Sequence, residues 1–234
     1  MLIFVIVMKE MNRCMFRRLL VHLARLRYSR GFGIQSPTAY AFFRDVVFEK
    51  LPYYAYEPLS RLSDPRLGEG ECRLLFRIVN YASPAVAIDV FPSSMTPVSY
   101  MAAVSSRIKA VALTAGHLPA GSMTDVATGG ELGFCIDDGN VAERLSALCA
   151  GERVVAHINR IDDTGLMAEA VTAIVRHFGP GSIVLVEGIN SRKVKDIWRN
   201  ACRVVEGGVA FDLYDMGILI SEPGMESHYY KLNY

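Results

Sequence analysis

From Pro84 almost to the C-terminus, short apolar runs alternate with stretches that have helical periodicity. The apolar runs are Val86–Val90, Ala110–Leu113, Phe134–Ile136, Arg153–Ile158 and Ile183–Val186, and the helical stretches lie near Met95–Ser105, Val141–Ala150, Leu166–Phe178 and Lys193–Val205. Strands and helices that alternate at this length are joined by right-handed crossovers, which cover both faces of a parallel sheet with helices. The pattern therefore predicts a Rossmann-like α/β domain over residues 84–234.

The C-terminal end follows a different pattern, because no helical stretch separates its apolar runs. Val209–Leu213, Gly217–Ile220 and Tyr229–Leu232 follow one another directly. Strands that are joined by such short connections usually pair antiparallel. We therefore expect an antiparallel hairpin at one edge of the sheet, with its turn near Asp215–Gly217.

Residues 1–83 are predicted to form helices that pack on this domain. Apolar residues recur at helical spacing from Met11 to Tyr28, and seven arginines but no acid lie between Met11 and Arg44. Such a helix either contacts a membrane surface or a nucleic acid, or packs its apolar side on the domain and exposes its arginines. We favour packing, since the stretch is rich in large apolar residues and has no lysine cluster, and we expect no nucleic-acid partner.

Composition narrows the classes of protein further. Of the 234 residues, 51% are hydrophobic and 21% are charged, which is enough for a full core, and the net charge is only +1. The apolar start, Met1–Val7, is too short to cross a bilayer, and its basic residues come after it rather than before it. The five cysteines form no CxxC pair, so neither a zinc site nor a disulfide framework is expected. We expect a cytoplasmic protein without a transmembrane segment.

In an open parallel sheet, ligands bind outside the carboxyl ends of the strands. The first strand runs through Asp89 and continues into Phe91, Pro92 and Ser93. A nucleotide-binding turn needs glycine here, so that the backbone can approach the ligand, and this turn has none. Ser93 can still cap the next helix, whose N-terminus favours an anion. Asp89 and Ser93 are therefore candidate cofactor-binding residues.

Polar residues also stand at the ends of the other expected strands. Thr114 follows the second strand, where an acid would bind ribose hydroxyls, and Asp137 follows the third, where it can accept from an adenine amine or belong to an Asp-Gly turn. His157 and Glu187, on the fourth and fifth strands, are candidate catalytic bases, although a histidine at a strand end is often structural. One carboxylate and one imidazole do not make a convincing metal site, so no metal is expected.

Three stretches carry a resemblance to a known family: Arg30–Pro37 followed by Tyr53–Tyr56, then Leu75–Tyr81, then Val186–Trp198 together with Phe211–Ile218. On these residues the chain resembles class I S-adenosylmethionine-dependent methyltransferases of the O-methyltransferase-like type found in Bacteroidetes-type bacteria. The resemblance covers most of the chain from about Met11. It implies a seven-stranded sheet whose last strand is antiparallel, S-adenosylmethionine as cofactor, and methyl transfer to a small-molecule acceptor.

The chain departs from the pattern of that family where the cofactor would bind. Family members usually have a Glu-x-Gly-type turn after the first strand and an acid after the second, where this chain has Asp89–Pro92 and Thr114. They also tend to carry Asp near Asn159 and an Asp pair near Glu187, and of these only Glu187 keeps a carboxylate. Two hypotheses follow. The protein is a working methyltransferase that uses His157 or Glu187 as a base, or it is a non-catalytic binding or interaction module with an eroded cofactor site.

Overall fold

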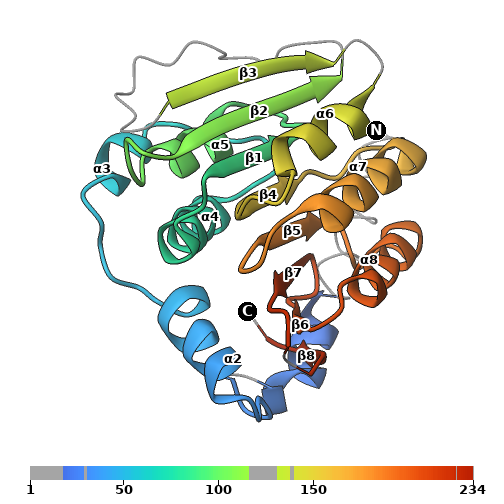
Figure 1. Cartoon of the computed structure of the whole chain (residues 1–234). Coiled ribbons are helices and arrows are strands. Elements are labelled where there is room, and N and C mark those ends of the chain that lie inside the picture. The colour runs from blue at the N-terminus through green and yellow to red at the C-terminus, as the bar shows by residue number, and fades with distance from the viewer. Residues whose placement is uncertain (1–17, 29–30, 116–130, 138–139, 225, 234) are drawn as a thin grey trace, which may run out of the picture.

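The computed structural model describes residues 18–28, 31–115, 131–137, 140–224 and 226–233, with the backbone alone for residue 115 and for residues 131–137. These residues form one sheet with helices on both faces (Figure 1). The strand order is β3-β2-β1-β4-β5-β7-β6-β8. The strands are β1 (Val86–Val90), β2 (Lys109–Ala115), β3 (Glu131–Asp137), β4 (Val154–Ile158), β5 (Ile183–Glu187), β6 (Gly208–Asp212), β7 (Met216–Ser221) and β8 (His228–Lys231).

The sheet confirms the expected α/β class and corrects the number of strands. Strands β1 to β5 run parallel, and β7 runs antiparallel to both β5 and β6. The β6–β7 hairpin turns between Asp212 and Met216, as the loss of helical pattern predicts. An eighth strand, β8, pairs parallel with β6 at the edge, so the sheet has one strand more than the seven expected.

In the described part of the chain, helices on the two faces of the sheet enclose two large apolar cores and a third, small cluster. Residues of α2 (Pro37–Phe42) and α4 (Glu69–Ala82) belong to one core, and residues of α6 (Val141–Cys149), α7 (Thr164–His177) and α8 (Arg192–Val204) belong to the other. We call the first the α4 core and the second the α7 core. Successive residues of a strand point to opposite faces. Thus Val155 belongs to the α4 core, while its neighbour Ala156 belongs to the α7 core. The remaining helices are η1 (Leu26–Tyr28), η2 (Phe43–Val47), α3 (Tyr56–Leu59) and α5 (Thr96–Ala102).

Two dipeptides of the N-terminal region, Ser36-Pro37 and Asp64-Pro65, have the residue types of a helix N-cap followed by a first-turn proline. The Ser36 hydroxyl accepts from the amide of Ala39 at 3.3 Å, and Pro37 takes the first position of α2, as the sequence predicts. In contrast, α4 begins at Glu69 rather than directly after Asp64 and Pro65. None of the helices in the described part of the chain is long and apolar enough to cross a bilayer.

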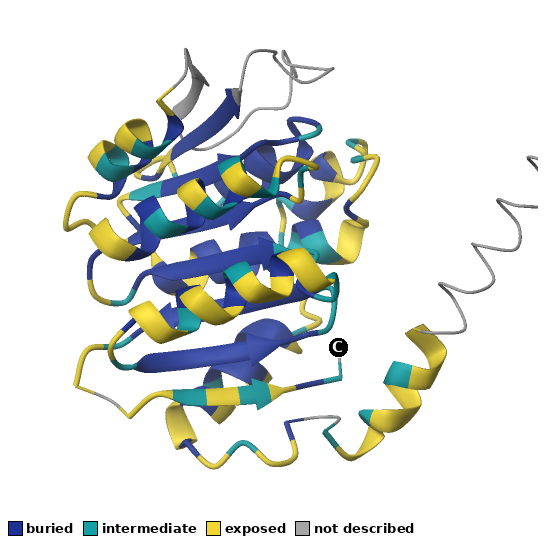
Figure 2. Cartoon of the chain, turned by 90° about the vertical axis from the view of Figure 1, so that its right-hand side faces the viewer, coloured by how far each residue is buried: buried dark blue, intermediate teal, exposed yellow. Residues whose placement is uncertain are grey.

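The helix at residues 18–24 docks in the opposite sense to the prediction. Arg25, expected to be exposed, has a side chain only 14% exposed that donates to the Asp212 carboxylate at 2.9 Å and to the carbonyl of Leu232 at 3.0 Å. Leu19 and Leu23, expected to point inward, are 55% and 54% exposed (Figure 2). The guanidinium of Arg25 has five N–H donors. It pairs the Asp212 carboxylate and two backbone carbonyls, which an apolar side chain in this place would leave without a hydrogen bond. The predicted part from Met11 to Arg17 lies outside the described residues.

A glycine in β7 gives a test of this packing. A Cβ atom added to Gly217 would lie 2.8 Å from the ring of Trp198, which is completely buried. We expect Gly217→Ala to lower the free energy of unfolding by about 1–3 kcal/mol, because the core is overpacked. Gly70→Ala is the control, since its added Cβ would meet nothing within 4 Å, and it is expected to be neutral or stabilising by up to about 1 kcal/mol. Urea unfolding measures both, and equal midpoints for the two variants would contradict this account.

Candidate functional site

The carboxyl ends of β1, β4 and β5 lie side by side at the centre of the sheet. Strand β1 stands between β2 and β4, where the strand order reverses direction, and open α/β sheets bind their ligands at such a point. Asp89 on β1 is the register partner of His157 on β4, and β5 beside them ends at Glu187. Each of the three lies two residues after a member of the α4 core, so their side chains lie on the face covered by α4. The fold thus brings together three of the predicted site residues.

Asp89, His157 and Glu187 form a buried triad of ionisable side chains. The Nδ1 atom of His157 lies 2.8 Å from Oδ1 of Asp89, and its Nε2 atom lies 3.2 Å from Oε1 of Glu187. The side chains of His157 and Asp89 have no exposed surface, and that of Glu187 is 13% exposed. Asn159 completes the cluster by donating its amide N–H to Oδ1 of Asp89 at 2.6 Å and to the carbonyl of Val90 at 3.0 Å.

The two carboxylates determine the charge of His157. Burial alone would lower the pKa of this imidazole, but hydrogen bonds from it to Asp89 and Glu187 raise its pKa to about 10. Burial also opposes ionisation of Glu187, yet the hydrogen bond and charge of His157 hold the pKa of Glu187 below its ordinary value. Burial raises the pKa of Asp89, whose second oxygen has no partner among the described side chains. At neutral pH, His157 is therefore a cation that donates from both ring nitrogens.

The turn after β1 is held by the protein's own side chains. Phe91 adopts φ +56°, a left-handed conformation that glycine adopts easily and other residues adopt at a cost. Its side chain is 7% exposed and packs in the α7 core. The hydroxyls of Ser93 and Ser94 donate to Oδ2 of Asp64 at 3.1 and 2.5 Å. The turn is therefore anchored by a phenyl ring in the α7 core and tied to the segment that precedes α4.

Asp64 is a residue of this site that the sequence did not reveal. Its Oδ1 atom accepts from the backbone amides of Arg66 and Leu67, each at 2.7 Å. Burial opposes its ionisation, but the hydrogen bonds from Ser94 and from the two amides lower the pKa of its carboxyl. The Asp-Pro dipeptide indicated a local cap, and Asp64 does accept local amides. Its link to the serines after β1 is a tertiary contact without a local signal.

Thr114 and Asp137 stand at the carboxyl ends of β2 and β3. Thr114 is buried, and it pairs in register with Ile136, as Ala115 pairs with Asp137. Their backbones thus lie at the same edge of the sheet as the triad. The side chain of Asp137 and residues 116–130 lie outside the described part of the chain. The roles predicted for these two residues remain predictions.

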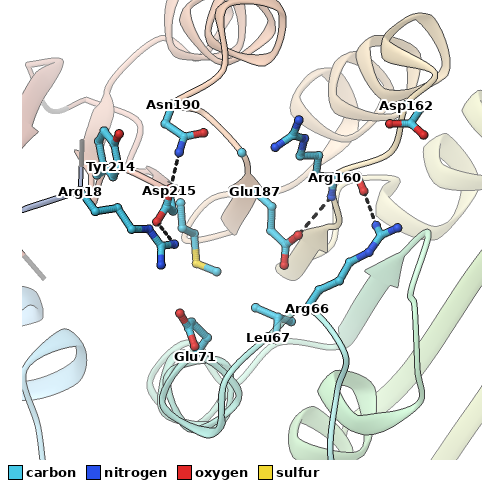
Figure 3. A pocket seen from close by; sticks show the side chains of 12 residues that line it. Arg18, Arg66, Leu67, Glu71, Arg160, Asp162, Glu187, Asn190, Tyr214 and Asp215 are labelled. Atoms are coloured by element: carbon cyan, nitrogen blue, oxygen red, sulfur yellow. Dashed lines mark hydrogen bonds and ion pairs between the residues drawn. The ribbon is translucent and has the colours of Figure 1, made fainter. Parts of the chain in front are cut away.

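A cavity of 540 Å³ opens beside the triad, at the ends of β4 and β5 and the start of β7 (Figure 3). Glu187 belongs to both the triad and the cavity lining. Its Oε1 atom accepts from His157, and its Oε2 atom accepts from the amide of Arg160 at 3.2 Å. Gly188 (φ +72°) allows this arrangement, since an added Cβ would lie 2.7 Å from Cδ of Arg160. The lining residues are Arg18, Arg66, Leu67, Glu71, Arg160, Asp162, Glu187, Gly188, Asn190, Tyr214, Asp215 and Met216.

Charged groups of both signs surround this cavity. Arg66 donates to the carbonyl of Arg160 at 2.6 Å, and Asp215 is held by Arg18 and Asn190. Within the described part of the chain, the Arg160 guanidinium makes no hydrogen bond or ion pair. Sequence reasoning missed Arg66 and Arg160, because isolated arginines in loops carry no pattern. Among the described residues, no group of three or more His, Cys, Asp and Glu side chains could hold a metal ion.

Several solved structures that are similar to this chain in fold are methyltransferases. An O-methyltransferase from Bacillus cereus, in complex with SAH, has a TM-score of 0.54 at 13% identity and covers 77% of this chain and 96% of its own. The O-methyltransferase TomG from Streptomyces achromogenes, which is involved in tomaymycin synthesis and was solved with SAM, has a TM-score of 0.55 at 12% identity, with 76% and 96% covered. A methyltransferase from Geobacter sulfurreducens has a TM-score of 0.51 at 7% identity, with 80% and 97% covered.

These likenesses define the fold of the chain. It has the Rossmann-like fold of class I S-adenosylmethionine-dependent O-methyltransferases, as the resemblance in its sequence predicts. No family model matches the sequence, and no curated protein matches it. Identities this low carry no residue roles from one chain to another, so the function has to be argued from this chain's own site.

The triad predicts a particular dependence of stability on pH. His157 binds its proton up to about pH 10 in the folded protein, but only to about pH 6.5, its ordinary value, when unfolded. Its contribution to stability is therefore fully present below about pH 6.5 and is lost as the pH rises through about 10. We expect urea unfolding of the natural protein to show a loss of about 2–4 kcal/mol between pH 7 and pH 10, since each unit of pKa is worth about 1.4 kcal/mol.

Two histidine variants make this test specific. His157→Gln should be about 3–5 kcal/mol less stable at neutral pH, because it leaves buried carboxylates unpaired, and it should not show the alkaline loss. His177→Gln changes an exposed histidine at the end of α7 and should follow the natural protein. The same alkaline slope in His157→Gln and in the natural protein would show that the triad does not hold this proton.

Proposed function

We propose that this chain is a methyltransferase-like protein whose cofactor site has become structural, and that it acts as a binding module for a polar small molecule. The observation that carries the proposal is the burial of Asp89. An acid at the end of the first strand has to reach the ligand, but this one has no exposed surface and is held by His157 and Asn159.

The residues of the first turn do not fit S-adenosylmethionine. A cofactor turn usually has glycine there, so that the backbone can approach the ligand, and this chain has Phe91, whose ring is anchored in the α7 core. Ser93 and Ser94, whose hydroxyls could turn to a ligand, already donate to Asp64. Moving these groups aside would break several hydrogen bonds, each worth about 1–3 kcal/mol when a charged group takes part.

The two candidate bases, His157 and Glu187, are also hydrogen-bonded within the protein. Removal of a proton from an acceptor needs a free basic atom within hydrogen-bond reach. Both ring nitrogens of His157 are bound to carboxylates. Glu187 has one oxygen on that imidazole and the other on the amide of Arg160. We therefore assign these two residues to the structure of the site and derive no methyl-transfer step from them.

The cavity beside the triad supports binding as the remaining function. Its volume lies within the range of small-molecule sites. Arg160 and Arg66 offer guanidinium groups on one side, while Glu71 and Asp162 offer carboxylates. Such a lining suits a ligand that carries an anionic group together with a cationic or hydroxyl group.

A working methyltransferase is the second candidate, and one observation favours it. Thr114 and Asp137 lie at the same edge of the sheet, in neighbouring strands. If Asp137 accepts from an adenine amine, the far end of the cofactor could bind even though the first turn lacks glycine. The cavity would then hold the methyl acceptor.

Calorimetric titration with S-adenosylmethionine and S-adenosylhomocysteine separates the two candidates. We expect dissociation constants no tighter than about 100 μM, because a lost charged hydrogen bond alone costs roughly one to two powers of ten. Asp137→Ala should then change nothing, as should the control Asp196→Ala, which alters an exposed acid on α8. Low-micromolar binding that Asp137→Ala weakens and Asp196→Ala does not would refute the proposal and establish the methyltransferase.

A further inference from the structure

Four leucines stand exposed on the N-terminal helical segment of the described chain. Leu19, Leu20, Leu23 and Leu26 are 55%, 49%, 54% and 59% exposed. Single apolar side chains are common on protein surfaces, but several together usually mark an interaction site. We call these four residues the leucine face.

The leucine face is fixed in its outward position by contacts on another side of the helix. Arg18 pairs with Asp215, His22 lies 2.6 Å from the Asn233 side chain, and Arg25 binds Asp212. Residues 18, 22 and 25 are spaced by about one and two helical turns, so they form one stripe. At about 100° per residue, Leu19, Leu20 and Leu23 lie about 100–200° round the helix from Arg18, whereas His22 lies about 40° from it. These leucines are therefore directed away from the docked stripe.

Charge complementarity indicates what covers the leucine face. Seven arginines and no acid lie between Met11 and Arg44, and the seven residues Met1–Val7 that open the chain are all apolar. Three of these arginines, Arg18, Arg25 and Arg44, are paired with Asp215, Asp212 and Asp45. Arg27 is exposed beside the leucines. A second copy of the chain would bring the same basic segment against this one, and the like charges would repel each other. An anionic lipid surface can bury the leucines in its apolar acyl region and offers negatively charged head groups to the arginines.

We propose that the leucine face docks the protein on the surface of an anionic membrane, as a helix that lies in the interface and does not cross it. The leucines enter the boundary between head groups and acyl chains, and Arg27, which is exposed beside them, meets the lipid phosphates. Arg18, which lines the cavity, belongs to the docked stripe of the same helix and so faces away from the membrane (Figure 3).

Sedimentation of the full chain with lipid vesicles tests this proposal. The probes are vesicles of phosphatidylcholine alone and vesicles that also contain phosphatidylglycerol. We expect binding to the anionic vesicles that weakens as salt is added, because salt screens the arginines. A variant with Leu19→Ser, Leu23→Ser and Leu26→Ser should bind at least about tenfold less tightly, since it loses apolar area from the interface.

A matched control carries Leu51→Ser, Tyr54→Ser and Val204→Ser, which are exposed apolar residues outside the leucine face. It should bind the anionic vesicles as the natural protein does, and circular dichroism should show that both variants remain folded. The proposal is overturned if the natural protein does not bind the anionic vesicles, or if the leucine variant binds them equally well. Sedimentation velocity tests the remaining outcome, which is self-association of the protein. If the natural protein self-associates, the leucine variant does not, and neither binds vesicles, the leucine face contacts a second copy of the chain and the proposal is wrong.

Discussion

An ion triad inside the sheet constrains the rest of this structure. His157 has no exposed surface, and its two ring nitrogens meet one carboxylate from β1 and another from β5. A buried charge is tolerated only when it is paired and hydrogen-bonded, so the three central strands have to keep the register that pairs Asp89 with His157. The same contacts that hold the strands together also remove Asp89 from the edge where a cofactor would bind. The contacts that stabilise the sheet are thus the same contacts on which the proposed loss of the cofactor site rests.

The sequence predicted the members of this triad but not their contact. Asp89, His157 and Glu187 stood out because each is a polar residue at or near the end of an apolar run. Their meeting depends on β4 lying next to β1, and adjacency of strands that are distant in the chain has no local signal. The tie from Asp64 to the turn after β1 was missed for the same reason. Phe91 was recognised as unsuited to a cofactor turn, but its left-handed backbone and inward ring required the structure.

The N-terminal helix shows where reasoning from periodicity fails. Apolar spacing defines one side of a helix but does not say whether that side meets the same chain. Here the carboxylate of Asp212 and the carbonyls of Asp212 and Leu232 need hydrogen-bond donors. Arg25 supplies these donors, which a leucine side chain cannot do. The leucine face is left outward as a consequence, while Arg18 on the docked side of the helix lines the same cavity as Glu187. The charged docking stripe, the cavity and the triad therefore form one continuous region across β4, β5 and β7.

The protonation state of His157 tests the central claim most directly. Long-range proton–nitrogen NMR spectra of the labelled protein report whether each ring nitrogen carries a hydrogen. At about pH 8 the account predicts that both nitrogens of His157 are protonated and that they remain so until the pH approaches about 10. A neutral His157 with one bare nitrogen, titrating near its ordinary pKa of 6.5, would contradict the ion triad. That result would also make His157 a candidate general base again.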